Sequence, residues 1–377
     1  MAPAPDQPPA RSAPSRSHYA VRSRTTLSTV AAVVGLLVVA ALAAAPFYAG
    51  RGALQDLFFI LTLLALAQFW NMLAGFAGLV SVGQQAFVGL GAYGLYALTI
   101  LGGLDPIAAL PLAGLGTGLL ALPVALLVFR LQGAYFAIGT WVVAEVFRLL
   151  LAQVKPLGGG TGTALPKAAT TDAPVVRLIA QALGLRPVAA RDILALWLAL
   201  AVAVATVLLV YAVLRSRQGL ALAAIRDNER AAGSVGVEAF RTKLIVFVTA
   251  AFGTGLVGGL IYLAKARISP DAAFSLPDWT ANVIFVVVIG GIGTIEGPIV
   301  GVLVFYGLQH FLAGFGAWYL MLLGALAIVT MLFCPRGIWG TLAQRWDVSL
   351  FPIQRRLVAA RPVEAEAIAS LRGASSR

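Results

Sequence analysis

Two charged residues inside an apolar stretch are the first candidates for chemistry. Glu145 and Arg148 lie in "GAYFAIGTWVVAEVFRLLLAQV", where either charge alone at the centre of a bilayer would cost about 2.5 to 3.5 kcal/mol. Residues three apart share one face of a helix. We therefore expect a structural ion pair, with a place in a permeation pathway as the alternative.

Motifs of the common enzyme and metal sites are absent from the sequence. The glycines of "LGGGTGT" (residues 157–163) resemble a phosphate-binding loop, but that loop requires Gly-Lys followed by Ser or Thr, and Gly-Lys occurs nowhere. Cys334 is the single cysteine, and with only His18 and His310 beside it no zinc ligand set can be assembled. No G-x-S-x-G or H-E-x-x-H signature occurs. The sequence argues against an enzyme, a metal site and a resident cofactor.

Glycine and polar residues interrupt two apolar stretches. The first glycine segment is "AGFAGLVSVGQQAFVGLGAYG" (residues 74–94), and the second is "IGGIGTIEGPIVG" (residues 289–301). Lipid cannot satisfy the polar groups of bent backbone, so such segments are buried in protein or line a water-filled cavity. Interrupted segments in two halves of a chain are typical of a central pathway through a membrane. The candidate pathway residues are Asn71, Gly75, Gly78, Ser81, Gln84, Gln85, Glu145, Gly290, Gly291, Gly293, Glu296 and Gly297. For Glu296, a turn-stabilising role or a contact to a partner is favoured over proton transfer.

The elements that position these residues follow from composition. The 377 residues are 60% hydrophobic and 11% charged, with a mean hydropathy of +0.91, which exceeds the apolar content of soluble domains. Uncharged runs long enough to cross a bilayer as helices recur along the chain. We expect an all-α polytopic integral membrane protein with about ten transmembrane helices. The expected spans are residues 27–45, 54–74, 84–101, 106–129, 133–154, 192–214, 241–264, 279–296, 298–313 and 317–334.

Basic residues predict the orientation, because short cytoplasmic segments collect Lys and Arg. Arginines cluster before the first span, between the sixth and seventh spans, and after the tenth span. Both termini are therefore expected to be cytoplasmic. Residues 1–26 are expected to form a disordered tail, residues 27–334 the transmembrane domain, and residues 335–377 a C-terminal tail. The net charge of +12 is explained by this topology, so no nucleic-acid partner is expected.

Two observations leave alternatives at this stage. By this count of spans, residues 155–191 lie on the extracytoplasmic side of the membrane, yet they carry five basic residues against one interior acid, Asp172. Longer loops follow the charge rule less strictly. The first apolar run, residues 27–45, would be a cleaved signal in the weaker interpretation, but it exceeds the length of a signal core.

Residues 215–240 form a charged segment between two apolar spans. Good helix formers extend from Gln218 to Gly236, with Leu220, Ala224, Ala231, Ala232 and Val235 available for an apolar side. Such a helix could seat in a groove of a soluble partner and carry force to the spans that it joins. An interfacial helix resting on lipid headgroups is the alternative. The candidate coupling residues are Arg226, Asp227, Asn228, Glu229, Ala231, Ala232 and Gly236.

Four stretches resemble successive blocks of the LivM-type permease subunit of branched-chain amino acid ABC importers. They are "NMLAGFAGLVSVGQQAFVGLGAYG", "LQGAYFAIGTWVVAEVFRLL", "RSRQGLALAAIRDNERAAGSVGVEAFRTKL" and "VVVIGGIGTIEGPIVGVL", and the likeness covers roughly residues 50–340. "NERAAGSVG" is similar to the coupling motif of ABC import permeases, with Glu229, Ala231, Ala232 and Gly236 in the motif positions and Arg230 inserted. Many members have Gly-His where this chain has Gly83-Gln84, so no role of that histidine transfers.

The resemblance implies a permease subunit in the bacterial plasma membrane, without ATP hydrolysis of its own. The implied partners are a paralogous LivH-type permease, two cytoplasmic ABC ATPase subunits, an extracytoplasmic solute-binding protein and the lipid bilayer. The family also imports urea, amides and other small amino or carboxylic compounds, so the cargo stays open. An ion-coupled secondary transporter or channel for a small polar solute is the alternative function.

Overall fold

The apolar runs fold as helices, because a helix satisfies every backbone polar group within its own segment. The computed structural model describes residues 19–22, 26–312, 314, 318–334, 336–346, 350–351 and 356–359. The helices are α1 (Thr26–Ala44), α2 (Arg51–Asn71), α3 (Gln84–Ile100), α4 (Pro106–Val128), α5 (Ala134–Ala152), α6 (Pro174–Leu183), α7 (Pro187–Arg215), α8 (Arg217–Asp227), α9 (Glu229–Ser234), α10 (Ala239–Lys265), α11 (Pro270–Ala273), α12 (Asn282–Gly290), α13 (Glu296–Leu312), α14 (Trp318–Phe333) and α15 (Gly337–Trp346).

The prediction of an all-α polytopic membrane protein is confirmed. Among the described residues, eight helical stretches are long and apolar enough to cross a membrane. They are Ser28–Phe47, Arg51–Phe76, Pro106–Val128, Ala134–Ala152, Pro187–Arg215, Ala239–Lys265, Pro270–Gly290 and Gly324–Trp346. Helices α3 and α13 coincide with two further expected spans, but each has 17 residues and is shorter than a helix that crosses ~30 Å of hydrocarbon. The count of ten stays a prediction.

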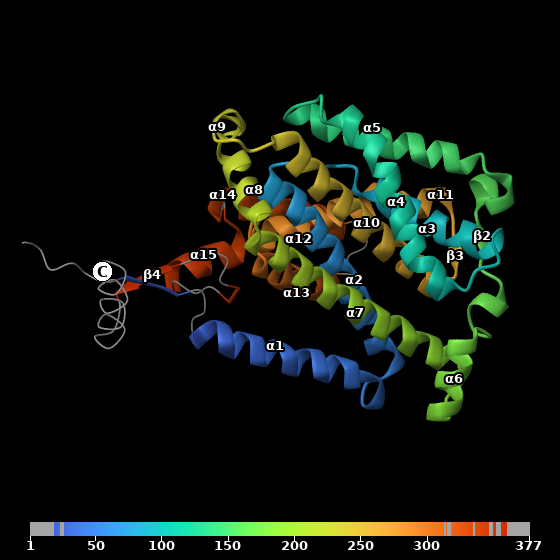
Figure 1. The fold of residues 1–377 in the computed structure, drawn as a ribbon. Coiled ribbons are helices and arrows are strands. Elements are labelled where there is room, and N and C mark those ends of the chain that lie inside the picture. The colour runs from blue at the N-terminus through green and yellow to red at the C-terminus, as the bar shows by residue number, and fades with distance from the viewer. Residues whose placement is uncertain are drawn as a thin grey trace, which may run out of the picture.

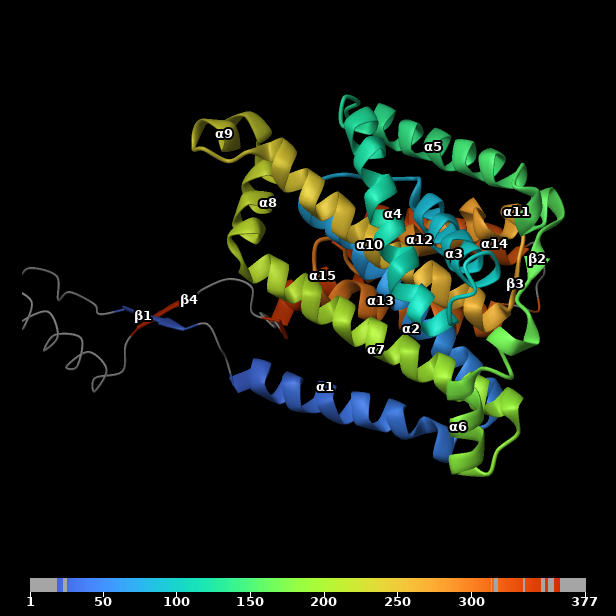
Figure 2. The same ribbon diagram turned by 45° about the vertical axis from the view of Figure 1, so that its right-hand side comes forward.

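Helix α10 lies at the centre of the bundle and packs against α2, α3, α4 and α7 (Figures 1 and 2). Its contact with α3 depends on glycine, because a Cβ at Gly91 would overlap the backbone of Gly255. From Gln84 onward the first glycine segment forms the regular helix α3, close to the expected span of residues 84–101, and the interruption lies before it. Its later glycines therefore serve close helix packing, as small residues do between membrane helices.

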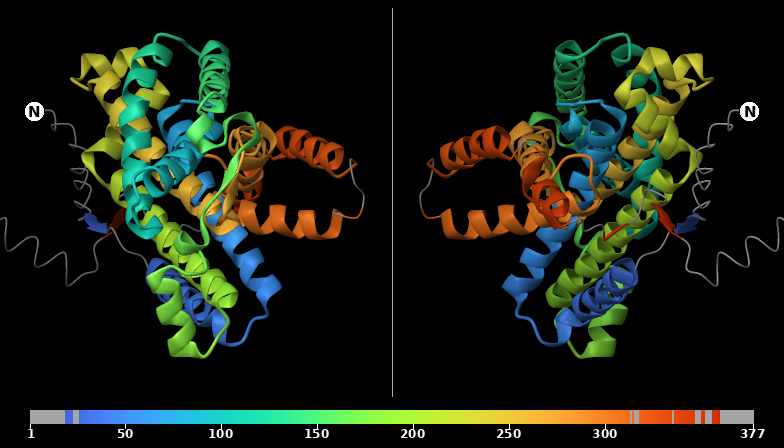
Figure 3. Two further views of the ribbon diagram at one scale, coloured as in Figure 1. Left: turned by 90° about the vertical axis from the view of Figure 1, so that its right-hand side faces the viewer. Right: turned by 90° about the vertical axis from the view of Figure 1, so that its left-hand side faces the viewer.

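Helices α1 and α5 lie at the periphery, where most of their large apolar side chains are exposed. Trp197 on α7 ties α1 to the bundle, since its indole Nε1 donates to the carbonyl oxygen of Ala43 at 3.0 Å. Helices α13 and α14 also extend from the body (Figure 3). The apolar outer surfaces of these helices suit contact with lipid or with another membrane subunit.

Two short antiparallel ribbons join distant parts of the chain. Strand β1 (Tyr19–Arg22) pairs with β4 (Arg356–Ala359), and β2 (Thr163–Ala164) pairs with β3 (Arg267–Ile268). The β1–β4 ribbon was not expected, because the composition of residues 1–26 indicates a disordered tail. Most of that tail and the end of the C-terminal tail lie outside the described residues.

The two ends of the bundle carry different elements. Helices α8, α9 and α15 and the β1–β4 ribbon lie at one end, whereas α6, α11 and the β2–β3 ribbon lie at the other (Figures 1 and 2). The described parts of the tails that form β1 and β4 therefore lie at the same end as the coupling segment, residues 215–240. The cytoplasmic orientation of that end stays a prediction.

Candidate coupling and translocation site

The two glycine segments meet at the end of α2. The Nδ2 atom of Asn71 donates to the carbonyl oxygen of Thr294 at 2.8 Å, and its Oδ1 atom accepts from the backbone N–H of Gly293 at 2.8 Å. One turn earlier, the Nε2 atom of Gln68 donates to the carbonyl oxygen of Ile295 at 2.7 Å. Both amide side chains are completely buried. They satisfy backbone groups that the interruption between α12 and α13 leaves without helical partners.

Glycine at position 75 allows this meeting. Gly75 lies in a turn of π-helix, Met72–Phe76, that follows α2. A Cβ added there would lie 2.6 Å from the nitrogen and 2.9 Å from the Cα of Gly293. Gly293 itself has a φ of +77°, which favours glycine. The backbones at Gly75 and Gly293 therefore approach so closely that no side chain fits between them.

Arg226 joins the coupling segment to this contact. Its Nη1 atom donates to the carbonyl oxygen of Gly75 at 3.2 Å. A Cβ built on Gly293 would lie 3.5 Å from the same Nη1, and one built on Gly78, which has a φ of +71°, would lie 4.0 Å from Cγ of Arg226. One side chain of α8 thus binds the first glycine segment and lies next to Gly293 of the second. Residues Asn71, Gly75, Gly78, Arg226 and Gly293, which the sequence assigned to two separate sites, form one cluster.

The polar residues at the start of α3 lie deeper in the protein. The Nε2 atom of Gln84 donates to Oγ1 of Thr254 at 2.6 Å, and Gln85 pairs with Thr280 through both its backbone N–H and its side chain. Trp70 donates its indole N–H to the carbonyl oxygen of Ser81 at 2.8 Å. Ser81, Gln84 and Gln85 are buried within this chain. Their hydrogen bonds hold α3 to α2, α10 and the segment before α12.

The remaining residues of the second glycine segment support the start of α13. Gly290 packs against the backbone of Gly297, and Gly291, with a φ of +137°, lies against α15. The Oε1 atom of Glu296 accepts from the backbone N–H groups of Leu350 and Phe351 at 3.1 and 3.0 Å. Glu296 therefore stabilises a turn by binding the C-terminal segment, and nothing in the sequence indicated that partner.

Glu145 lies away from the cluster, on α5. Arg148 binds it at 2.5 to 3.0 Å, as the spacing predicts, and the Nη1 atom of Arg148 also binds Asp271 of α11 at 2.6 Å. The side chain of Glu145 is 47% exposed. The structural ion pair is therefore present, and a second carboxylate extends it to a neighbouring element.

The coupling segment is two helices, where a single helix from Gln218 to Gly236 was expected. Asn228 leaves the helical conformation, and its Oδ1 atom accepts from the N–H of Ala231 at 3.1 Å. The side chain thereby ends α8 and caps the start of α9. Glu229 follows the cap and binds Lys243 of α10 at 2.7 Å.

The apolar side of the coupling segment also differs from the expected one. Leu222, Ile225 and Ala232 are buried, whereas Leu220 and Val235 are 76% and 77% exposed. The reason is the bend at Asn228, which changes the direction of α9 and separates its residues from the face of α8. Asp227, Glu229, Ala231 and Gly236 are exposed as well. This segment therefore exposes apolar groups together with charged ones, of which Glu229 is paired with Lys243 and Asp227 lies 3.8 Å from Arg226.

Removing the amide of Asn71 should destabilise the protein. Asn71→Ala loses both hydrogen bonds to the second glycine segment and leaves two backbone groups buried without partners, which costs about 1 to 3 kcal/mol for each such group. Asn71→Asp keeps the acceptor for Gly293 but loses the donor to Thr294 and sets a buried carboxylate against that carbonyl oxygen, so we expect a loss at least as large. Thermal unfolding of the purified variants in one detergent measures both. An unchanged unfolding midpoint for Asn71→Ala would show that the contact contributes nothing.

Comparisons with known proteins agree with this architecture. Residues 52–331 match the family model described as branched-chain amino acid transport system / permease component. The chain is 28% identical to the high-affinity branched-chain amino acid transport system permease protein LivM of Escherichia coli K12, and 27% identical to the protein of the same name from Salmonella typhimurium LT2. Each match covers 81% of this chain and 74% of the relative. No solved structure shows a significant match. The matched residues include both glycine segments and the coupling segment, and the chain belongs to the family of branched-chain amino acid transport permeases.

Proposed function

We propose that the chain is a permease subunit of an ATP-binding cassette importer for branched-chain or related small amino acids in the bacterial plasma membrane. The observation that carries this proposal is the bond from Arg226 to Gly75. It connects the exposed coupling segment directly to the contact between the two glycine segments. A movement of α8 imposed from outside the membrane would therefore act on the interrupted helices without an intervening element.

The exposed end of the coupling segment supports a soluble partner. Leu220 on α8 and Val235 after α9 expose apolar side chains, and Asp227 and Arg230 expose charged ones. A mixture of exposed apolar and charged side chains suits a protein interface. We assign this partner as the ATPase subunits and their side as the cytoplasm. The lipid-facing interpretation would place Arg230 and Asp227 on the headgroups and leave the capped turn at Asn228 without a role.

The remaining partners belong to the same proposal. A second permease of the same family would complete the pathway, because the polar residues around Gly75 are packed against this chain's own backbone. A solute-binding protein would deliver the solute at the end that carries α6, α11 and the β2–β3 ribbon. In this assembly ATP and the loaded binding protein would favour different packings of the glycine segments.

The proposal is tested by reconstitution. Proteoliposomes that contain this chain, the second permease and the ATPases should take up labelled leucine from the binding protein only when ATP is present. Uptake by this chain alone, driven by an ion gradient, would instead establish an ion-coupled transporter.

A charged residue introduced into the exposed surface at the end of α9 should separate this chain from the ATPase subunits. We expect Val235→Asp to reduce co-purification of the ATPases by at least about tenfold, because it places a charge in an apolar contact. Insertion in the membrane should be unaffected. Leu185→Asp is the matched control, since Leu185 is an exposed apolar residue at the opposite end of α7. Equal co-purification of the two variants would contradict docking at α9.

A further inference from the structure

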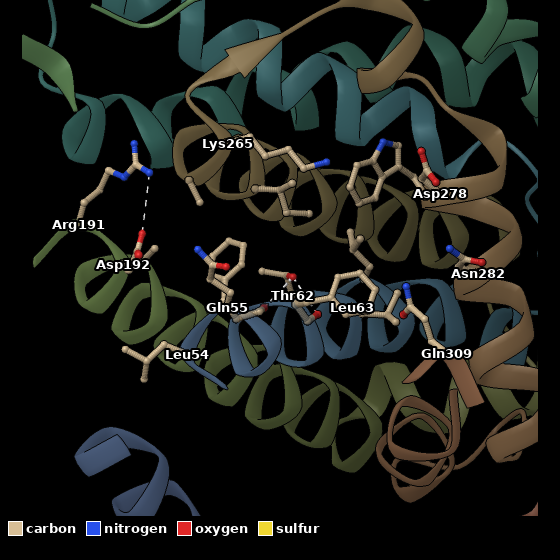
Figure 4. Close-up of a pocket in the computed structure, with 17 residues that line it drawn as sticks. Leu54, Gln55, Thr62, Leu63, Arg191, Asp192, Lys265, Asp278, Asn282 and Gln309 are labelled. Carbon is tan, nitrogen blue, oxygen red and sulfur yellow. Dashed lines mark hydrogen bonds and ion pairs between the residues drawn. The ribbon is translucent and has the colours of Figure 1, made fainter. Parts of the chain in front are cut away.

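A cavity of about 430 Å³ opens at the end of the bundle opposite the coupling segment. It lies among the first turns of α2 and α7, the last turns of α10, the start of α12 and the end of α13 (Figure 4). Its floor is apolar, formed by side chains such as Leu63, Leu66 and Ile261, each at most 5% exposed. Its volume lies within the range of small-molecule pockets.

Two opposite charges at the rim of this cavity do not neutralise each other. The Nζ atom of Lys265 lies 4.8 Å from the centre of the Trp279 ring and 5.3 Å from that of Tyr262. Figure 4 shows Lys265 and Asp278 along the same edge of the cavity, with the ammonium of Lys265 directed toward the end of that edge where Asp278 lies. In the part of the chain that the structure describes, neither Lys265 nor Asp278 has an ion-pair partner.

Asp192 in the wall is already paired. It binds the Nε atom of Arg51 at 2.6 Å and lies 3.8 Å from Nη2 of Arg191, so it has little capacity left for a charged solute. The buried Nε atom of Arg191 has no hydrogen-bond partner among the described residues and is available to an anionic group. Lys265 and Asp278 add one free charge of each sign at the rim of the cavity.

We propose that this cavity binds a zwitterionic amino acid with an aliphatic side chain before translocation. The carboxylate binds Lys265, the ammonium lies between the Trp279 ring and Asp278, and the side chain rests on the floor near Leu66 and Ile261. A zwitterion supplies both missing counter-charges, and an aromatic face attracts the ammonium. Burying the aliphatic part on the floor contributes the hydrophobic term. The inference rests on the proposed function, because it identifies a site for the solute of that importer.

Photolabelling tests the site directly. The full-length chain, held in lipid nanodiscs, is irradiated with L-photo-leucine, a leucine analogue that carries a diazirine, and the labelled peptides are mapped. We expect label on the parts of α2 and α10 that line the cavity, and an excess of L-leucine should displace it. Label absent from these peptides, or insensitive to L-leucine, would overturn the inference. Labelling by a diazirine-bearing phospholipid that L-leucine does not displace would show a lipid pocket instead.

Variants at Lys265 test the charge. Lys265→Met should reduce the displaceable label at least about tenfold, since it removes a charge-assisted contact, and Lys265→Arg should retain most of it. The control is Lys167→Met, which removes the same charge from an exposed position outside the cavity at the same end of the molecule. Equal labelling of Lys265→Met and Lys167→Met would contradict the carboxylate contact.

The outcome separates this inference from the proposed function. ATP-dependent uptake by the reconstituted importer, together with no displaceable label in the cavity, would reject the site and leave the importer assignment standing. Displaceable label together with uptake that needs no ATPase would keep the site and reject the importer.

Discussion

Gly75→Val abolishes solute uptake in the reconstituted importer. This is the largest effect that we expect from a single substitution. The first carbon of the new side chain would occupy space 2.6 Å from the nitrogen of Gly293, and it would overlap the amide of Asn71. These neighbours are backbone atoms or a buried, hydrogen-bonded side chain, so they cannot move aside without a large cost in free energy. Overpacking in such a place costs about 1 to 3 kcal/mol or more.

The measurement combines uptake of labelled leucine with thermal unfolding of the purified variant. Gly116→Val is the matched control, because Gly116 lies inside the membrane helix α4 and a Cβ there meets nothing within 4 Å. Gly293→Leu enters the same contact from the other side and should also block uptake. If Gly75→Val transports as well as Gly116→Val at equal membrane content, the meeting of the glycine segments has no part in translocation.

The local features of this site could be predicted from the sequence. The pair of Glu145 and Arg148 follows from a spacing of three residues on a helix, and it is present. The interruptions near Gly78 and Gly293 follow from glycine and polar residues within apolar runs, and both adopt positive φ. In each case the decisive information lies within one or two helical turns.

The partners of these features could not be predicted, because they are distant in sequence. Asn71 and Gly293 are separated by 222 positions, and Arg148 and Asp271 by 123. Asn71 and Asn282 precede the two interruptions in a similar way, but that similarity does not indicate that Asn71 binds the backbone of the second segment. Periodicity reveals which face of a helix is apolar, and it does not reveal which helix covers that face.

The division of the coupling segment into α8 and α9 has a local signal in the sequence, but the high helix propensity of the surrounding residues argued against it. Asn228 is a favoured N-cap residue, and Glu229 is an acid in the first turn that follows it. The string of helix formers around these residues favours a single helix instead. The cap prevails because Asn228 binds the N–H of Ala231 and the new direction buries Ala232.

Arg226→Ala should separate ATP hydrolysis from transport. The variant loses the bond from α8 to the carbonyl oxygen of Gly75, while the exposed surface of α9, which we propose as the docking site of the ATPases, is unchanged. A hydrogen bond from a charged donor contributes about 1.5 to 3 kcal/mol, so we expect uptake to fall at least about tenfold. ATP hydrolysis stimulated by the binding protein should persist, because the motor still docks.

The ratio of solute moved to ATP hydrolysed measures this effect, and two further variants define its cause. Arg217→Ala removes an exposed arginine from the first turn of the same helix and should leave the ratio unchanged. Arg226→Lys keeps the charge but shortens the reach and removes the planar donor group, so it should restore little of the coupling. A normal ratio in Arg226→Ala would mean that force reaches the glycine segments by another route, most directly through the packing of α10 on α3.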